Sequence, residues 1–254
     1  IYTLSLHDAL PILACDVVKF LMEHERLSFP DAIRWLGRKY GIPVDDVPLD
    51  YTPPPQRPKP APLPMLEISK GYVKPGRIEA DNLVKWIATV PWDACQRARI
   101  VEVLKEYHIG HSRWGFTVFW QIDEQGRVRT GKMMKYKEDG HRNKESQYNF
   151  DWVHALMNRM NLIDTDKAEV KPCLFGLHLL DKYPDADVLI VESEKTAIIM
   201  SIAYGNHAKQ VWMACGGLQN ISKEKLAPIM KEGRRIVLYP DKDGVKEWEN
   251  KAQA

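Results

Sequence analysis

Two stretches decide the predicted fold, DVLIVESEKTA at residues 187–197 and RRIVLYPDKDG at residues 234–244. Each contains a run of apolar residues followed by acidic ones, Glu192 in the first stretch and Asp241 and Asp243 in the second. If both runs are parallel strands, the three carboxylates meet at the carboxyl edge of one sheet. Open α/β sheets bind their ligands at that edge.

Three converging carboxylates predict a site for a divalent cation, because hard cations prefer oxygen ligands. The cation expected is Mg²⁺, or Mn²⁺ in its place, held by Glu192, Asp241 and Asp243. The alternative is structural. Acidic residues are common at strand ends, and Asp-Lys-Asp-Gly at residues 241–244 is also an ordinary turn sequence.

Between and around these stretches, apolar strand-like runs alternate with helix-like segments. Gly216 and Gly217 form a turn signal after the middle run. Such alternation with short loops predicts a parallel sheet with right-handed crossovers. The predicted strands are 188–191, 210–214 and 235–239, and the predicted helices are 194–204 and 222–231.

A basic β-hairpin is predicted upstream, with arms at residues 114–122 and 127–136. Residues 126–144 hold seven lysines and arginines against two acidic residues. The arms are expected to expose four cations beside Trp114 and Trp120, a combination suited to single-stranded nucleic acid. The alternative is a solvated hairpin face with at least one tryptophan in the core. The four cations are Arg127, Arg129, Lys132 and Lys135.

The amino-terminal part predicts two short helices within residues 16–41, followed by a proline-rich linker. Eight of the seventeen residues at 48–64 are proline, which favours an extended spacer. Residues 1–12, IYTLSLHDALPI, resemble a translated sequencing adapter and are set aside as non-native. The chain is therefore expected to be a fragment broken at both ends.

Bulk composition excludes some classes of protein. The chain has 254 residues and a net charge of +2, so its total charge predicts no partner. No apolar run is long enough for a membrane span, and no membrane partner is expected. The four cysteines show no Cys-x-x-Cys spacing, so neither a complete zinc site nor a disulfide framework is predicted, and a cytoplasmic location fits.

The acidic motifs resemble those of the toprim domain, which bacterial primases, topoisomerases and some nucleases share. The family pattern is a glutamate after the first strand, a Gly-Gly turn after the second, and Asp-x-Asp after the third. Here these positions hold Glu192, Gly216-Gly217, and Asp241 with Asp243. One departure is Ser193, which stands where primases usually carry glycine.

Further stretches resemble bacterial replicative primases. Residues 16–42 are similar to the helical tail that follows their zinc ribbon, and the hairpin with LFGL at residues 174–177 is similar to the part that precedes toprim. The order of these parts resembles primase-like proteins of bacterial mobile elements and phages. The resemblance implies an α/β fold: a toprim-type parallel sheet flanked by helices, after an α+β basic subdomain and a short helical remnant of a zinc ribbon.

The resemblance also implies a division of the chain into parts. After the adapter-like residues 1–12, these are a helical tail at 13–47, the linker at 48–65, the basic subdomain at 66–185 and a truncated toprim domain at 186–254.

The implied function is synthesis of RNA primers on a DNA template. Glu192, Asp241 and Asp243 would be catalytic and hold the metal, and the hairpin cations would bind the template. Lys195 would bind a phosphate at a helix amino terminus, or else pair with a neighbouring glutamate. Zn²⁺ would occupy the missing zinc ribbon. The implied partners are single-stranded DNA, nucleoside triphosphates and a replicative helicase.

Two alternatives stay open. The first is a nucleic-acid-binding accessory protein that recruits a helicase and uses a degenerate toprim domain as a scaffold. The second is a toprim nuclease, although an upstream zinc-ribbon tail is not usual for nucleases of this fold. Dependence on nucleoside triphosphates would separate synthesis from cleavage.

Overall fold

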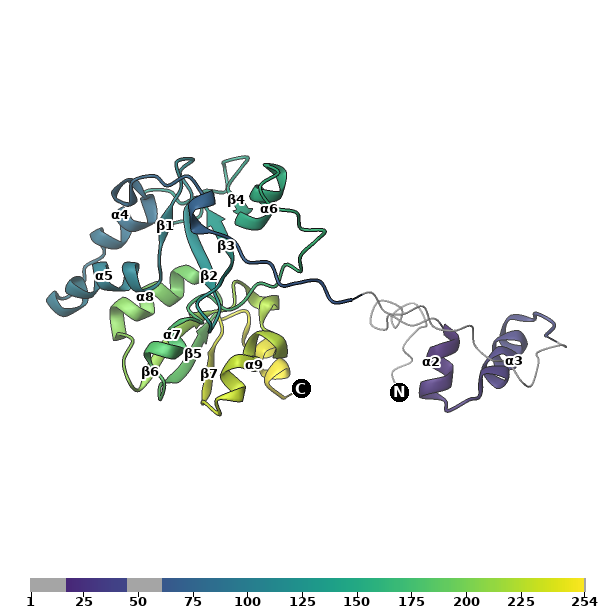
Figure 1. Ribbon diagram of the computed structural model, residues 1–254. Coiled ribbons are helices and arrows are strands. Elements are labelled where there is room, and N and C mark those ends of the chain that lie inside the picture. Colours follow the sequence, from purple (N-terminus) through teal and green to yellow (C-terminus); the bar gives the residue numbers. More distant parts are fainter. Residues whose placement is uncertain (1–16, 45–60, 254) are drawn as a thin grey trace. The chain divides into compact units, whose positions relative to one another are not determined.

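The computed structural model describes residues 17–44 and 61–253, and it divides into two compact units, Ile1–Ala61 and Pro62–Ala254 (Figure 1). The boundary between the units falls inside the segment 48–65 that the sequence predicts as a linker. The adapter-like residues 1–12 and residues 48–60 of that linker lie outside the described residues.

The first unit contains the two short helices that the sequence predicts, α2 (Val17–His24) and α3 (Phe29–Tyr40). Ser28 caps α3, because its hydroxyl accepts a hydrogen bond of 3.3 Å from the backbone N–H of Asp31. Gly41 ends the helix with a φ of 66°, a left-handed conformation that glycine adopts at little cost.

The second unit begins with an antiparallel sheet of strand order β1-β2-β3-β4. Strands β2 and β3 form the predicted hairpin around a turn in which Asp123 N–H donates to the Arg127 carbonyl at 3.0 Å. Every residue of β2 is buried, and so are all but the first of β3. The strands are β1 (Gly110–His111), β2 (Thr117–Ile122), β3 (Val128–Met134) and β4 (Phe150–Trp152).

A parallel sheet follows, with strand order β6-β5-β7 and β5 in the centre. Helices α8 and α9 connect its strands, which confirms the predicted α/β fold with a parallel sheet flanked by helices. The bounds of α8 and β6 agree with the sequence prediction at both ends. The elements are β5 (Asp187–Val191), α8 (Glu194–Tyr204), β6 (Gln210–Ala214), η3 (Leu218–Asn220), α9 (Lys223–Lys231), β7 (Ile236–Tyr239) and α10 (Val245–Gln253).

The remaining helices surround the antiparallel sheet and the entry to the parallel one (Figure 1). Helix α5 packs against α8, where Arg99 donates to the carbonyls of Ile202 and Ala203 at 2.8 and 3.1 Å. No helix among residues 17–44 and 61–253 is both long and apolar enough to cross a bilayer. The elements are η1 (Lys70–Tyr72), η2 (Ile78–Ala80), α4 (Asn82–Thr89), α5 (Ala94–Glu106), α6 (Val153–Arg159) and α7 (Leu179–Lys182).

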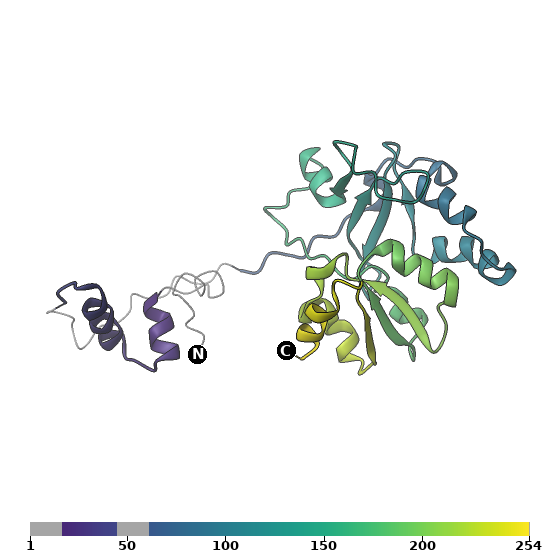
Figure 2. The same cartoon turned by 180° about the vertical axis from the view of Figure 1, so that it is seen from behind.

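One hydrophobic core joins the two sheets of the second unit, which lie one above the other in both views (Figures 1 and 2). Phe175 lies in the segment that connects β4 to β5. Its ring stacks on that of Tyr107, the residue after α5, with 5.0 Å between the ring centroids. It also meets Phe119 of β2 edge-on at 5.7 Å. The parallel sheet is therefore anchored on the antiparallel one by aromatic packing.

Candidate active site

Glu192 lies at the carboxyl end of β5, the central strand of the parallel sheet. Helix α8 begins two residues later, capped by Ser193, whose hydroxyl accepts from Thr196 N–H at 3.1 Å. The Glu192 carbonyl accepts from Gly216 N–H at 2.9 Å. The backbone thus fixes Glu192 between the start of α8 and the turn after β6.

The loop after β7 lies against the Glu192 carboxylate. The N–H of Asp241 donates to Glu192 Oε1 at 3.0 Å, and Gly244 N–H closes the turn on the Asp241 carbonyl at 2.8 Å. A Cβ at Gly244 would lie 2.4 Å from Glu192 Oε1 and 2.7 Å from Leu218 Cδ1, so a larger residue there would displace these two side chains. The side chains of Asp241 and Asp243 are exposed.

The surroundings of Glu192 penalise its negative charge. Burial raises the pKa of Glu192 above its usual value, and the carboxylates of Asp241, Asp243 and Glu247 raise it further. The hydrogen bond from Asp241 N–H acts in the opposite direction and does not cancel these effects. Negative charge therefore accumulates at this edge of the sheet.

An oxygen donor set with mutual repulsion has the chemistry that a hard divalent cation requires. However, residues 17–44 and 61–253 contain no group of three or more His, Cys, Asp or Glu side chains arranged to hold a metal ion. The structure brings the Asp241 backbone onto Glu192, and it leaves the Asp241 and Asp243 carboxylates in solvent. The residue types fit Mg²⁺ or Mn²⁺, and closing the site requires a shift of these two side chains.

A cavity of about 390 Å³ with a basic lining adjoins the Gly-Gly turn, and we call it the cationic cavity. Arg142 and Lys144 line it, and neither side chain has an ion pair or hydrogen bond among the described residues. Phe150, which is 45% exposed, offers an aromatic face in the same lining. The full lining is Lys132, Met134, Arg142, Lys144, Asn149, Phe150, Gly216 and Gly217.

The sequence places Arg142 and Lys144 in the cation-rich window at 126–144 without predicting a specific site for them, and it gives no signal for Phe150. The signal available was the surplus of cations that continues past the hairpin into the GHRNK segment at residues 140–144. Only the fold shows that this loop lies beside Gly216 and Gly217, some seventy residues further along the chain.

A buried ion pair connects the antiparallel sheet to the first turn of α8. Lys132 Nζ lies 2.9 Å from Glu194 Oε2 and also donates to the Gly216 carbonyl at 2.9 Å. The two side chains are 5% and 2% exposed. Glu194 Oε1 is buried and has no hydrogen-bond partner among the described residues.

The prediction that all four hairpin cations are exposed is wrong for Lys132 and Arg129. Arg129 is buried, donates to the Leu66 carbonyl at 3.0 Å and lies 3.3 Å from Asp123 Oδ2. Both faces of β3 are covered by other parts of the protein. Side chains that alternate between the two faces of the strand are therefore buried on either side. The presence of Asp123 in the hairpin turn was the sequence signal that an arginine of the hairpin could pair within the protein.

The side chains of the other two hairpin cations are partly exposed to solvent. Arg127 pairs with the same Asp123 carboxylate at 2.8 Å, and its side chain is 33% exposed. Lys135 is half-buried, with Nζ 4.8 Å from the centroid of the Phe116 ring. Of the four predicted cations, Arg127 and Lys135 are therefore the two that a ligand in solution can reach.

Lys195, predicted to bind a phosphate, contacts the basic subdomain. Its Nζ donates to the Gly140 carbonyl at 3.0 Å and lies 5.0 Å from the centroid of the Trp86 ring. Burial lowers the pKa of Lys195, and the Arg142 guanidinium lowers it further. The predicted pairing with a neighbouring glutamate is absent among the described residues, since Glu194 pairs with Lys132 instead.

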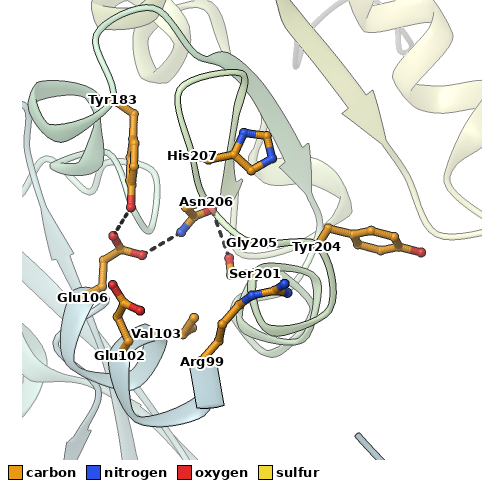
Figure 3. A pocket seen from close by; sticks show the side chains of 10 residues that line it. All are labelled: Arg99, Glu102, Val103, Glu106, Tyr183, Ser201, Tyr204, Gly205, Asn206 and His207. Carbon is orange, nitrogen blue, oxygen red and sulfur yellow. Dashed lines mark hydrogen bonds between the residues drawn. The ribbon is translucent and has the colours of Figure 1, made fainter. Parts of the chain in front are cut away.

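A second polar cavity, of about 250 Å³, lies between α5 and α8 and holds none of the predicted site residues (Figure 3). Glu106 accepts from Tyr183 Oη at 2.6 Å and from Asn206 Nδ2 at 2.8 Å. Ser201 Oγ in turn contacts Asn206 Oδ1 at 3.3 Å. Because these groups satisfy one another, the network joins the two helices and offers little to a ligand.

Comparisons with known proteins give one family match and distant likenesses among solved structures. No curated protein matches the chain. Among solved structures, the primase fragment of the bacteriophage T7 primase-helicase protein is 18% identical, with a TM-score of 0.41 over 60% of this chain and 56% of that one. The Aquifex aeolicus primase, zinc-binding and RNA polymerase domains, is 14% identical, with a TM-score of 0.40 over 93% of this chain and 60% of that one.

These scores are too low to assign function by likeness, and the chain spans less than two thirds of either solved chain. The family model for a domain of unknown function, DUF6371, matches residues 81–242. That span begins at the cap of α4, includes both sheets, Glu192 and the Gly-Gly turn, and reaches the loop after β7. Because the match covers more than half of the sequence, the chain belongs to the DUF6371 family.

Proposed function

We propose that this protein transfers nucleotides on a nucleic-acid template, and that its reaction is RNA primer synthesis on single-stranded DNA. The observation that carries the proposal is the approach of the 241–244 loop to Glu192, at a sheet edge that adjoins the cationic cavity. The acidic groups at this edge could hold a metal ion. The cations of the cavity, which have no partner among the described residues, and its aromatic face could bind a nucleotide. Replication of a phage or another mobile element is the proposed setting.

In this proposal Glu192, Asp241 and Asp243 hold Mg²⁺ or Mn²⁺. When bound, a divalent cation neutralises phosphate charge and lowers the barrier to attack by a 3′-hydroxyl. Glu192 needs to be ionised to act as a ligand, and its raised pKa falls when positive charge is close. The 241–244 loop positions the acidic residues through the hydrogen bond from Asp241 N–H to Glu192.

The cations take separate roles. Arg142 and Lys144 would neutralise the phosphates of a nucleoside triphosphate in the cationic cavity, and Phe150 would stack on its base. Arg127 and Lys135 would contact the template. Arg129 and Lys132, being buried, would support these groups without touching the strand. Lys195 would reach a phosphate only after leaving the Gly140 carbonyl.

The test is primer synthesis by the full-length protein on single-stranded DNA with labelled nucleoside triphosphates and Mg²⁺ or Mn²⁺. We expect short metal-dependent products from the native protein and none from the Asp241→Asn/Asp243→Asn variant. Asp185→Asn is the matched control, since Asp185 is exposed and lies outside the site. A folded double variant that still makes primers would disprove the assignment, and nucleotide-independent cleavage would identify a nuclease.

A second candidate function is a non-catalytic accessory protein that binds nucleic acid and recruits a helicase. The observation in its favour is that the described residues bring no three metal ligands together. On this proposal, DNA binding is salt-sensitive and depends on Arg142 and Lys144, while Asp241→Asn/Asp243→Asn changes nothing. Binding assays on the same variants therefore separate the two functions.

A further inference from the structure

A cavity of about 650 Å³ beside helix α5 is lined by none of the residues in the proposed active site, and we call it the α5 groove. Its walls are mainly aliphatic, with Val101 and Leu104 on α5 and Ile78 and Val84 facing them. Val101 is 60% exposed, so the apolar wall reaches solvent. The volume is in the range of sites that hold a ligand or an anchoring side chain, about 300–1,000 Å³.

A hydrogen-bond donor without a partner lies in this lining. Trp120 of β2 is 5% exposed, and its indole Nε1–H has no acceptor among the described residues. This N–H is not one of the fully buried polar atoms that lack a partner, so it is open to a ligand in the groove. A ligand in the groove that presented a carbonyl or carboxylate oxygen would satisfy it. Trp114, the other tryptophan predicted beside the hairpin cations, is 39% exposed and does not line the groove.

Unpaired positive charge surrounds the apolar walls. Lys70 and Lys105 line the groove, and neither ammonium has an ion pair or a hydrogen-bond acceptor among the described residues. Burial lowers the pKa of Lys70, as expected for a half-buried ammonium without a counter-ion. Burial also lowers the pKa of His108, and Lys70 lowers it further. Glu79 is the one carboxylate in the lining.

We propose that the α5 groove is a docking site for an acidic peptide segment of a partner protein, which inserts large apolar side chains between α5 and the 78–84 segment. Its carboxylates meet Lys70 and Lys105, and its backbone or an acidic side chain accepts from Trp120 Nε1–H. Charge complementarity of this kind sets both the choice of partner and its rate of association.

Single-stranded nucleic acid is the competing occupant, and the lining disfavours it. Nucleic acid is held by aromatic faces along a continuous cationic groove. The α5 groove offers one tryptophan, aliphatic walls and the like charge of Glu79. Trp120 belongs to a different core cluster from its neighbour Phe119, which packs with the parallel sheet. The Trp120 wall of the groove thus belongs to the face of β2 opposite Phe119.

The experiment is a selection from a library of short random peptides on the full-length protein, with counter-selection on Val101→Glu/Lys105→Glu. Enriched peptides are then labelled and titrated by fluorescence anisotropy. We expect acidic sequences with Leu, Ile or Phe, and binding about tenfold weaker for Val101→Glu and for Lys105→Glu singly. Both residues are exposed, so folding is preserved, and circular dichroism checks this.

Met230→Glu and Lys209→Glu are matched controls, because both side chains are exposed and lie outside the groove. They should bind the peptides as the native protein does. No enrichment, or enriched peptides without acidic residues, would overturn the proposal. So would a labelled oligothymidylate that displaces the peptides and loses affinity in Lys105→Glu, since the occupant would then be nucleic acid. Primer synthesis should be unchanged in Val101→Glu.

Discussion

At the scale of single residues, the Lys132–Glu194 pair is the contact with the largest expected effect. Both charges are buried, and Lys132 also holds the Gly216 carbonyl of the Gly-Gly turn. Removing one partner of a buried pair leaves the other charge desolvated and uncompensated, whereas an apolar replacement of both avoids that cost.

We therefore expect Lys132→Met to lower the free energy of unfolding by about 3–5 kcal/mol. The double variant Lys132→Met/Glu194→Met should recover much of this loss. Urea unfolding of the two single variants and the double variant, analysed as a double-mutant cycle, measures the coupling. A single variant within error of the native protein would show that the pair contributes no net stability.

The raised pKa of Glu192 predicts how stability depends on pH. A carboxyl group whose pKa is higher in the folded state favours folding while it is protonated, and this contribution is lost as pH rises through the folded-state pKa. Above that pH, the ionised Glu192 opposes folding.

Glu192→Gln keeps an oxygen to accept from Asp241 N–H and removes the charge. At neutral pH it should raise the Tm, and the loss of stability between acidic and neutral pH should be smaller than in the native protein. Added Mg²⁺ should stabilise the native protein and not the variant, because a ligand that binds only the folded state shifts the equilibrium. Thermal scans across pH, with Glu102→Gln as an exposed control, give the answer.

At the scale of elements, α5 is set by its first turn. Asp93 accepts from Gln96 N–H at 2.8 Å, and Gln96 Oε1 accepts from Asp93 N–H at 3.1 Å, which is a complete capping box. Arg99, one turn further, ties the helix to the carboxyl end of α8. The same helix lines both the polar cavity and the α5 groove.

Asp93→Ala should destabilise the second unit by about 1 kcal/mol, because the Gln96 N–H at the helix start loses its acceptor. Urea unfolding followed by circular dichroism measures the change. Glu102→Ala, in the middle of α5 and exposed, is the control and should have little effect. A loss confined to peptide docking, with unchanged global stability, would mean that the α5 start frays independently.

At the scale of the whole molecule, the core that joins the two sheets makes the second unit one folding unit. Phe175 packs on Tyr107 and Phe119, and Trp212 accepts at its carbonyl from Tyr107 Oη. The parallel sheet has three strands among the described residues, and much of its apolar surface faces the α5 end and β2.

A fragment of residues 186–254 should therefore not fold, while residues 62–254 should unfold in one cooperative transition. Separation removes the partners of Val188, Ile190 and their neighbours in the shared core. Circular dichroism and dispersion of amide resonances distinguish the two outcomes. A cooperatively folded 186–254 fragment would show that the sheet does not depend on the upstream subdomain.

The elements of the parallel sheet could be predicted from the sequence alone, because hydrophobic period and turn signals are local. The order of strand and helix from 188 to 239 and the hairpin follow from neighbours a few residues apart. Placing Glu192 and the 241–244 loop at one sheet edge also follows, since parallel strands bring their carboxyl ends together.

Which charges are buried and which are free depends on the tertiary structure. Lys132 and Arg129 lie in a strand covered on both faces, and their partners Glu194 and Asp123 come from a helix start and a turn. Within the part of the chain that the structure describes, Arg142 and Lys144 have no ion-pair partner, and they lie beside Gly216, which is far along the chain. Burial and pairing depend on contacts between distant segments, and a local pattern of charges carries no information about those contacts.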